Sequence, residues 1–249
     1  MEALVCLTLA GVRLPCVLQF PENAARLSAT PLDRPSCPVE PVSIPAAHWP
    51  FYASTGVRNS PDGEYTVLPC YCSEALMAYD RMIFHSVAIR WRDKAYLITA
   101  PSGVGKSTQA KHLQALRPGE FSIICGDRPV LQFCPSVDAA PEADQFVMVH
   151  PSCWNGKEGW HGAKAAPLAG LILLERGDEN RICTLSPREA AIPSFQQAFQ
   201  SYSRPDVVRT TAKMVTKLLQ FVPIWKLTTH EVPDSTRLLL ETVFSAPES

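Results

Sequence analysis

The sequence has no excess of charge of either sign. Its 249 residues include 23 Lys and Arg against 24 Asp and Glu, so the formal net charge is −1 and the pI is near 6.6. A protein that attracts nucleic acid or an anionic membrane through its overall field carries a clear positive excess. The composition therefore predicts neither nucleic acid nor a membrane as a partner.

Long apolar runs are also missing, and no stretch is long and apolar enough to span a bilayer. The apolar start of the chain carries Glu2 and has no basic segment of the kind that begins a secretory signal. We therefore expect a cytoplasmic protein. With 46% hydrophobic and 19% charged residues, the chain is long enough for one sizeable core, or for one domain with an appendage.

The cysteines do not indicate a disulfide framework. There are nine, an odd number, and Cys6, Cys125 and Cys183 lie within apolar runs, where a reduced thiol behaves as a small hydrophobe. We interpret the nine as mainly reduced core cysteines. Cys70 and Cys72 would face the same side of a strand, where buried thiols are commoner than strained redox pairs.

Zinc donors occur in one short stretch of the chain. His150, Cys153 and His161 carry suitable atoms, but their spacing matches no closed structural site and a fourth ligand is not evident. We therefore do not expect a zinc site there.

Prolines set the N-terminal part apart from the rest. They crowd residues 31–50, a spacing that disfavours long helices and central strands. We expect residues 1–80 to form a Pro-rich, β-leaning region of short strands and turns, with residues 64–68 as the clearest strand. This region is either packed on the core or appended to it, and it covers the core or mediates assembly into a homo-oligomer.

Residues 81–249 alternate between strand and helix patterns. The predicted strands are 83–89, 95–99, 121–125, 130–133, 145–149, 167–175 and 224–227. The predicted helices are 106–116, 188–200, 207–221 and 235–244. This order predicts an α/β core with helices packed on a mixed sheet.

A glycine-containing loop at residues 100–107 carries the chemistry. Its sequence, Ala-Pro-Ser-Gly-Val-Gly-Lys-Ser, fits the phosphate-loop (Walker A) pattern G-x-x-x-x-G-K-[ST] except at Ala100. A buried strand leads in and a helix leads out, so main-chain N–H groups and the positive helix end converge on an anion. The residues expected to bind the phosphates of Mg·ATP are Ser102, Gly103, Val104, Gly105, Lys106, Ser107 and Thr108.

Two side chains of this loop have separate roles. Lys106 reaches the outer phosphates, and Ser107 offers its hydroxyl to Mg²⁺. The alternative is a Gly-rich helix N-cap with an exposed lysine. That reading requires the motif and both flanking elements to agree by chance.

Asp127 follows the carboxyl end of the next predicted strand, residues 121–125. Ligands of open α/β sheets lie at the carboxyl ends of strands, so Asp127 and the loop are expected to share a crevice. A carboxylate there can hold Mg²⁺ or accept the proton of an attacking hydroxyl. The alternative is a turn aspartate that hydrogen-bonds the backbone before Pro129.

Four segments together resemble the HPr kinase/phosphorylase family. They are residues 84–88 (Phe-His-Ser-Val-Ala), 95–99 (Ala-Tyr-Leu-Ile-Thr), 102–108 (Ser-Gly-Val-Gly-Lys-Ser-Thr) and 125–130 (Cys-Gly-Asp-Arg-Pro-Val). More closely, they look like the HPr-kinase-like proteins of bacterial peptide-modification clusters, which are related to phosphoenolpyruvate carboxykinase in their nucleotide site. The similarity covers about residues 80–243 and continues through residues 154–158, 166–168, 171–176 and Asn180. It implies the mixed-sheet P-loop core of the HPr kinase C-terminal domain.

The resemblance also implies residue roles. His85 is expected to face the transferred phosphate or the substrate hydroxyl, and Asp127 to act as general base and Mg²⁺ ligand. Lys157 is expected to contact a phosphate or an acidic substrate, although it also suits an ordinary surface loop. Taken alone, a histidine such as His85 is more often a hydrogen-bonded core or interface histidine than a catalytic one.

The chain departs from HPr kinases proper at the acid. Those enzymes carry two adjacent aspartates, whereas here Asp127 is followed by Arg128, a candidate clamp for developing phosphate charge. The change disfavours the reverse phosphorolysis reaction. The family's later signature loop has no match either, which disfavours HPr as the substrate.

Two functions remain open from the sequence. The first is a kinase that transfers the γ-phosphate of ATP to a hydroxyl, a serine of a protein or peptide, with catalytic residues Asp127, His85 and Lys106 and with Mg²⁺ held by Ser107 and Asp127. The second is a P-loop module that binds or slowly hydrolyses ATP and signals by conformation. A transporter-type LSGGQ signature, an arginine-finger motif and the N-K-x-D guanine reader are all missing, which disfavours those other ATPases and GTPases.

Overall fold

The computed structural model describes residues 2–32, 40–135, 146–160, 162, 164–201 and 204–245. A mixed nine-stranded sheet forms the centre of this part of the chain, in the order β4-β8-β9-β10-β6-β5-β7, with β12 paired to β10 and β11 to β12. Its strands are β4 Arg81–Ile83, β5 Ser86–Trp91, β6 Lys94–Thr99, β7 Phe121–Cys125, β8 Val130–Cys134, β9 Phe146–His150, β10 Ala166–Arg176, β11 Arg181–Thr184 and β12 Ile224–Thr229.

Parallel pairing is confined to the middle of this sheet. Strand β10 runs parallel to β6 on one side and to β12 on the other, and the remaining pairs are antiparallel. The buried apolar run of β10 fits a strand covered on both faces. The predicted α/β class and mixed sheet are confirmed.

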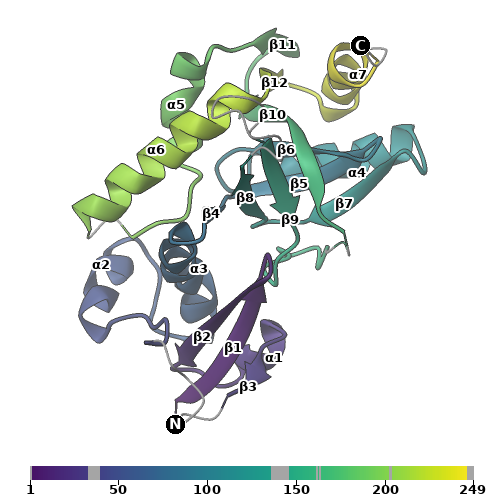
Figure 1. Cartoon of the computed structure of the whole chain (residues 1–249). Helices are drawn as coiled ribbons and strands as arrows, with labels where there is room; N and C mark the ends of the chain where they lie inside the picture. The colour runs from purple at the N-terminus through teal and green to yellow at the C-terminus, as the bar shows by residue number, and fades with distance from the viewer. Residues whose placement is uncertain are drawn as a thin grey trace.

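Two pairs of helices cover the two faces of the central strands (Figure 1). Helices α4 (Lys106–Leu116) and α7 (Val232–Val243) pack on one face, and α5 (Pro187–Phe195) and α6 (Pro205–Phe221) on the other. In α6 the buried residues recur every three or four positions, as the predicted core face requires. They are Val207, Thr211, Val215, Leu218 and Leu219.

The described residues of the N-terminal part form a second, smaller sheet together with three short helices and one long one. Strands β1 (Ala3–Leu9), β2 (Val12–Leu18) and β3 (Thr30–Pro31) pair antiparallel in the order β2-β1-β3. Ala10 and Gly11 both have positive φ at the turn between β1 and β2, which matches the twist of a tight hairpin. The helices are α1 Asn23–Arg26, η2 Ala46–His48, α2 Trp49–Ser54 and α3 Pro61–Met77.

The predicted strand at residues 64–68 is wrong, because these residues lie inside α3. The Ser60 side chain accepts a hydrogen bond from the Gly63 N–H, and Pro61 occupies the first turn, so a local signal for a helix start was present. Burial then follows a helical spacing through Glu64, Leu68, Cys72 and Leu76. The packing of that face stabilises the helix by more than Pro69, in its interior, destabilises it.

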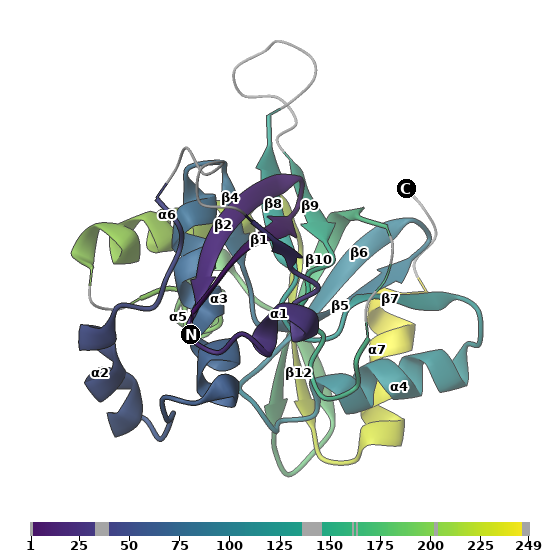
Figure 2. The same cartoon turned by 90° about the horizontal axis from the view of Figure 1, so that it is seen from below.

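Helix α3 brings the N-terminal part against the edge of the large sheet, beside β4 (Figures 1 and 2). The apolar cluster beneath the helix includes Leu68, Cys72, Ile83, Val130 and Trp154. Residues on both sides of the predicted boundary therefore share one core. The division into residues 1–80 and 81–249 stays a prediction.

Three other expectations need correction. The predicted strand 83–89 is two strands, β4 and β5, because the chain crosses between them at Phe84 and His85. The predicted helix 188–200 ends early at Phe195, and β11 was not predicted. Cys70 and Cys72 lie on α3, so the strand geometry assumed for them is wrong.

The remaining expectations concern thiols, metals and membranes. Eight cysteines are free in the described residues, and Cys37 lies outside them. No group of three or more His, Cys, Asp or Glu suited to a metal ion occurs in the described part, while His161 lies outside it. None of the described helices has the length and apolar character needed to cross a bilayer.

Candidate functional site

The loop at residues 100–107 connects the end of β6 to the start of α4. Gly103 and Gly105 have φ values of +84° and +125°, in the region that favours glycine. Ala100, which replaces the first glycine of the pattern, is 3% exposed and is not among the described residues with positive φ. An alanine is therefore tolerated at that position without backbone strain.

The first turn of α4 presents free main-chain donors. The Gly105 carbonyl accepts from the Gln109 N–H, which opens the helix. Within the described residues, the N–H groups of residues 105–108 donate no hydrogen bond to the protein. Such donors, together with the helix dipole, favour an anion at this end.

Lys106 is buried, not the exposed lysine of the alternative reading. Its side chain folds over the loop, and Nζ donates to the carbonyls of Ala100 at 2.9 Å and Pro101 at 3.4 Å. Nζ also lies 3.0 Å from Nε2 of His85. Burial lowers the pKa of Lys106, and the nearby carboxylate of Asp127 offsets part of that effect.

His85 is fixed from three directions at the crossover between β4 and β5. Its main-chain N–H donates to the Gln197 carbonyl at 2.8 Å, and its own carbonyl accepts from the Thr99 hydroxyl at 2.7 Å. Nδ1 lies 2.9 Å from Oε1 of Gln197. Nε2, on the other side of the ring, faces both Nζ of Lys106 and Oδ1 of Asp127, so it accepts from the lysine in one tautomer and donates to the acid in the other.

Asp127 lies at the carboxyl end of β7, two residues beyond the strand. Oδ1 is 3.4 Å from Nε2 of His85, and Oδ2 forms an ion pair with Nε of Arg128 at 2.9 Å. Burial by itself raises the pKa of Asp127. Its contact with His85 and the charge of Arg128 outweigh that effect and hold the pKa below its ordinary value.

The crossover also ties Asp127 to the His85 segment through the backbone. The Ser86 N–H donates to the Asp127 carbonyl at 2.9 Å. Lys106, His85, Asp127 and Arg128, which the sequence assigned to one site, therefore lie in one chain of direct contacts.

The segment after β9 covers the end of β7. The Gly126 N–H donates to the Trp160 carbonyl at 2.9 Å, and a side chain at Gly126 would collide with the Asn155 carbonyl. A Cβ at Gly156 would lie 3.2 Å from the Cβ of Asp127, so this backbone runs directly past the acid. The segment is also held to α4 by the 2.7 Å ion pair between Lys111 and Glu158.

Lys157 is on this covering segment, but its side chain is exposed and contacts no partner within the described residues. Its assignment to a phosphate or an acidic substrate stays a prediction.

Four groups that orient the site residues have roles that the sequence does not predict. Gln197 and Thr99 fix His85, while the Tyr65 carbonyl accepts from Nη1 of Arg128 at 3.1 Å. Nε1 of Trp154 donates to the same carbonyl at 3.2 Å. Long-range contacts such as these leave no local pattern in the sequence. The one local signal is Pro69, which lies four residues after Tyr65 and has no N–H to donate to the Tyr65 carbonyl.

The donor set fits Mg·ATP. The free N–H groups of residues 105–108 and the Lys106 cation match the charge of a triphosphate. Ser107 supplies a hydroxyl and Asp127 a carboxylate, both oxygen ligands that Mg²⁺ accepts alongside phosphate oxygens and water. Thr108 is exposed at the same helix end.

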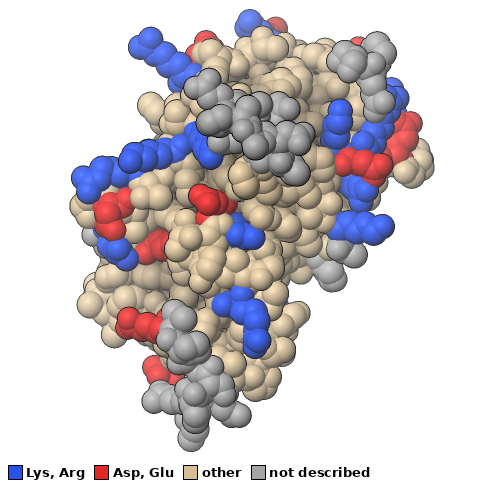
Figure 3. Space-filling view, in the orientation of Figure 1, with Lys and Arg blue, Asp and Glu red and all other residues tan. Residues whose placement is uncertain are grey.

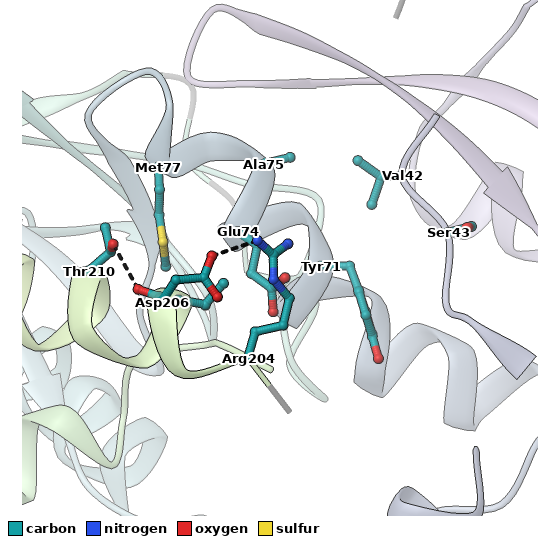
Figure 4. A pocket seen from close by; sticks show the side chains of 10 residues that line it. Val42, Ser43, Tyr71, Glu74, Ala75, Met77, Arg204, Asp206 and Thr210 are labelled. Carbon is teal, nitrogen blue, oxygen red and sulfur yellow. Dashed lines mark hydrogen bonds and ion pairs between the residues drawn. The ribbon is translucent and has the colours of Figure 1, made fainter. Parts of the chain in front are cut away.

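One face of the molecule and one cavity away from this site offer a comparison with it. Lys and Arg are interspersed with Asp and Glu on the face seen in Figure 3, and most of that face carries neither. A cavity of about 380 Å³ lies between α3 and α6, near Val42 and Ser43 (Figure 4). Its polar lining includes Glu74, Arg204 and Asp206, none of which belongs to the predicted site.

The described chain is thus an α/β protein whose glycine-containing loop joins a central strand to a helix. No family model and no curated protein sequence matches it. Among solved structures it is similar to the Hpr(Ser) kinase/phosphatase from Coxiella burnetii, with 13% sequence identity and a TM-score of 0.31 over 65% of this chain and 88% of that one. Neither value is high enough to carry a functional conclusion.

Proposed function

We propose that this protein is an ATP-dependent kinase that transfers the γ-phosphate to a hydroxyl, a serine of a protein or peptide. One observation carries the proposal. The chain of contacts from Lys106 through His85 to Asp127 places an acid beside the lysine of the glycine-containing loop, with separations of 3.0 and 3.4 Å. A glycine-rich loop whose role was only to cap α4 would function without a carboxylate beside its lysine, whereas phosphate transfer uses one.

In this proposal the phosphates of ATP lie on residues 102–108. The N–H groups at the start of α4 donate to phosphate oxygens. Lys106 exchanges two neutral carbonyl acceptors for a charged phosphate, which forms a stronger, charge-assisted hydrogen bond. Mg²⁺, when held by Ser107 and Asp127, neutralises charge that develops on the transferred group.

Asp127 orients the acceptor. The hydroxyl oxygen attacks the γ-phosphorus, its proton passes to the Asp127 carboxylate, and the bond to the β-phosphate oxygen breaks to release ADP. The lowered pKa of Asp127 makes it a weak base. Because the transition state of phosphoryl transfer is loose, its rate depends more on the position of the attacking hydroxyl than on the strength of the base, so a weak base suffices.

The second candidate is a P-loop ATP-binding or ATPase regulatory module. One contact favours it, the ion pair between Arg128 and Oδ2 of Asp127. In HPr kinases the position of Arg128 holds a second aspartate, which would leave this carboxylate oxygen unpaired and available for phosphate transfer. Such a module binds ATP and releases phosphate to water, or not at all, without an acceptor.

Incubation with γ-labelled ATP separates these functions. The purified protein is offered a library of serine, threonine and tyrosine peptides, and label is followed in peptide and in free phosphate. Labelled peptide supports the kinase, whereas free phosphate alone, or bound but intact ATP, supports the module. Lys106→Ala is the matched negative control, since it removes the loop cation and leaves Asp127 in place.

A further inference from the structure

Helix α3 contains a proline at position 69, in its interior. Proline has no N–H, so the carbonyl four residues earlier, that of Tyr65, has no intrahelical donor. An unpaired buried carbonyl costs free energy comparable to a lost hydrogen bond. The first question about this helix is therefore where the Tyr65 carbonyl finds its partners.

Its partners come from the region that holds the predicted acid. Nη1 of Arg128 donates to the Tyr65 oxygen at 3.1 Å, and Nε1 of Trp154 donates to it at 3.2 Å. Trp154 is fully buried, and the Arg128 side chain is 12% exposed. A carbonyl oxygen has two lone pairs, and both are used here.

The same arginine reaches the site with a second of its three nitrogens. Nε of Arg128 pairs with Oδ2 of Asp127 at 2.9 Å, while the guanidinium lies 4.9 Å from the centre of the Phe199 ring. Its backbone is fixed as well, because the carbonyl accepts from the Ser152 hydroxyl at 2.6 Å. The side chain of Arg128 therefore spans the distance between the Tyr65 carbonyl and the acid.

We propose that Pro69 is a positioning residue, which acts by freeing the Tyr65 carbonyl to anchor the guanidinium of Arg128 against Asp127. The N-terminal part of the chain then supplies a component of the site through a main-chain carbonyl, although none of its described side chains forms a hydrogen bond or ion pair with the loop at residues 100–107. For its effect on activity, this inference rests on the proposed kinase function. Its structural part stands independently of that function.

The substitution Pro69→Ala tests this positioning role. Alanine restores an N–H at position 69, which gives the Tyr65 carbonyl a helical donor that competes with Arg128 and Trp154. The better helix propensity of alanine offsets the loss of buried ring atoms, so Tm stays near that of the wild type. A purely structural role for Pro69 then leaves activity unchanged.

The proposal expects a split in the kinetic constants instead. The kcat for phosphate transfer falls about tenfold, the effect of weakening one hydrogen bond from a charged donor. The Kd for ATP stays within about twofold, since the loop and Lys106 do not touch Tyr65.

Pro193→Ala is the matched control. Pro193 is exposed and lies inside α5, and no side chain of the described residues donates to the Glu189 carbonyl four positions before it. This variant removes a helix-interior proline without affecting the site, so its kcat and its ATP affinity should equal those of the wild type.

Magnetic resonance of the Trp154 indole N–H provides a readout that needs no activity. Trp154→Phe assigns the signal among the five tryptophans. In the wild type, a coupling across the hydrogen bond to the Tyr65 carbonyl is expected, and in Pro69→Ala that coupling weakens and the indole N–H signal shifts.

The outcomes separate this inference from the proposed function. Loss of the indole coupling together with a lower kcat and an unchanged ATP affinity supports the positioning role. If Pro69→Ala is active with an unaltered kcat, the positioning role is wrong. It is also wrong if the wild type shows no coupling between the Trp154 indole and the Tyr65 carbonyl, a result that does not depend on whether the variant folds. If the wild type transfers no phosphate yet the coupling responds as expected, the proposed kinase function fails while the anchor of Arg128 stands.

Discussion

The substitution Arg128→Leu tests the electrostatics of the site. It removes the ion pair to Asp127 and the hydrogen bond to the Tyr65 carbonyl while keeping much of the apolar stem. The two paired side chains are 12% and 23% exposed, so the pair is only partly screened by water. Leaving a mostly buried carboxylate without its cation costs more than losing a surface pair, and we expect a destabilisation of about 2–4 kcal/mol at neutral pH.

The size of this effect should depend on pH with a definite sign. Burial raises the pKa of Asp127, but its contact with His85 and the charge of Arg128 hold the folded-state pKa below the unfolded value. The ionised carboxylate therefore stabilises the fold above the unfolded pKa of about 3.9. That contribution is lost as the pH falls through the lower, folded pKa. The difference between wild type and Arg128→Leu should shrink in the same acidic range.

Urea denaturation at pH 7, 5, 4 and 3 measures this difference directly. Arg237→Leu is the control, because Arg237 pairs with Asp234 on the surface, where both side chains are more than half exposed. Its effect should stay within about 0.5 kcal/mol at every pH. A destabilisation by Arg128→Leu that matches this control, or that does not change with pH, would refute the account of Asp127.

Three further predictions concern the loop, the acid and the thiols. Lys106→Ala should abolish ATP turnover, because the only loop cation is lost; detectable turnover at the wild-type rate would remove Lys106 from the site. Asp127→Asn should keep ATP binding by calorimetry but lower transfer about 10²–10⁴-fold, the range for loss of a positioned proton acceptor; normal transfer would exclude that role. Burial raises the pKa of the Cys70 thiol to about 12, so iodoacetamide at pH 8 should label this partly exposed cysteine far more slowly in the folded than in the unfolded protein, as peptide mass mapping can check.

How far the sequence predicts this fold depends on whether the signal is local. The loop, its flanking strand β6 and helix α4 were predicted with nearly their observed bounds, because the glycines, the lysine and the apolar periodicity lie within one short stretch. Helix α3 was missed because its prolines were weighed as helix breakers. Its Ser60 cap and its buried face, which pack against the N-terminal sheet, decide the structure instead.

The assembly of the site was predictable only in part. His85, Lys106 and Asp127 were assigned from family resemblance and strand ends, and they do contact one another. The groups that orient them, above all Gln197, come from distant parts of the chain. Gln197 lies 112 residues from His85 and reaches it only because the chain after α5 returns to the crossover. Such a contact cannot be predicted from the spacing of residues in the sequence.

The central claim is that the acid beside the loop lysine serves phosphate transfer to an acceptor. Its most direct test is the appearance of γ-label on a hydroxyl-bearing peptide, measured for the wild type, Lys106→Ala and Asp127→Asn at the same ATP concentration. We expect stable label on the serine of an acceptor peptide with the wild type, none above background with Lys106→Ala, and at least about 10²-fold less with Asp127→Asn. Binding of ATP by the wild type with label found only in free phosphate, whatever peptide is offered, would contradict it.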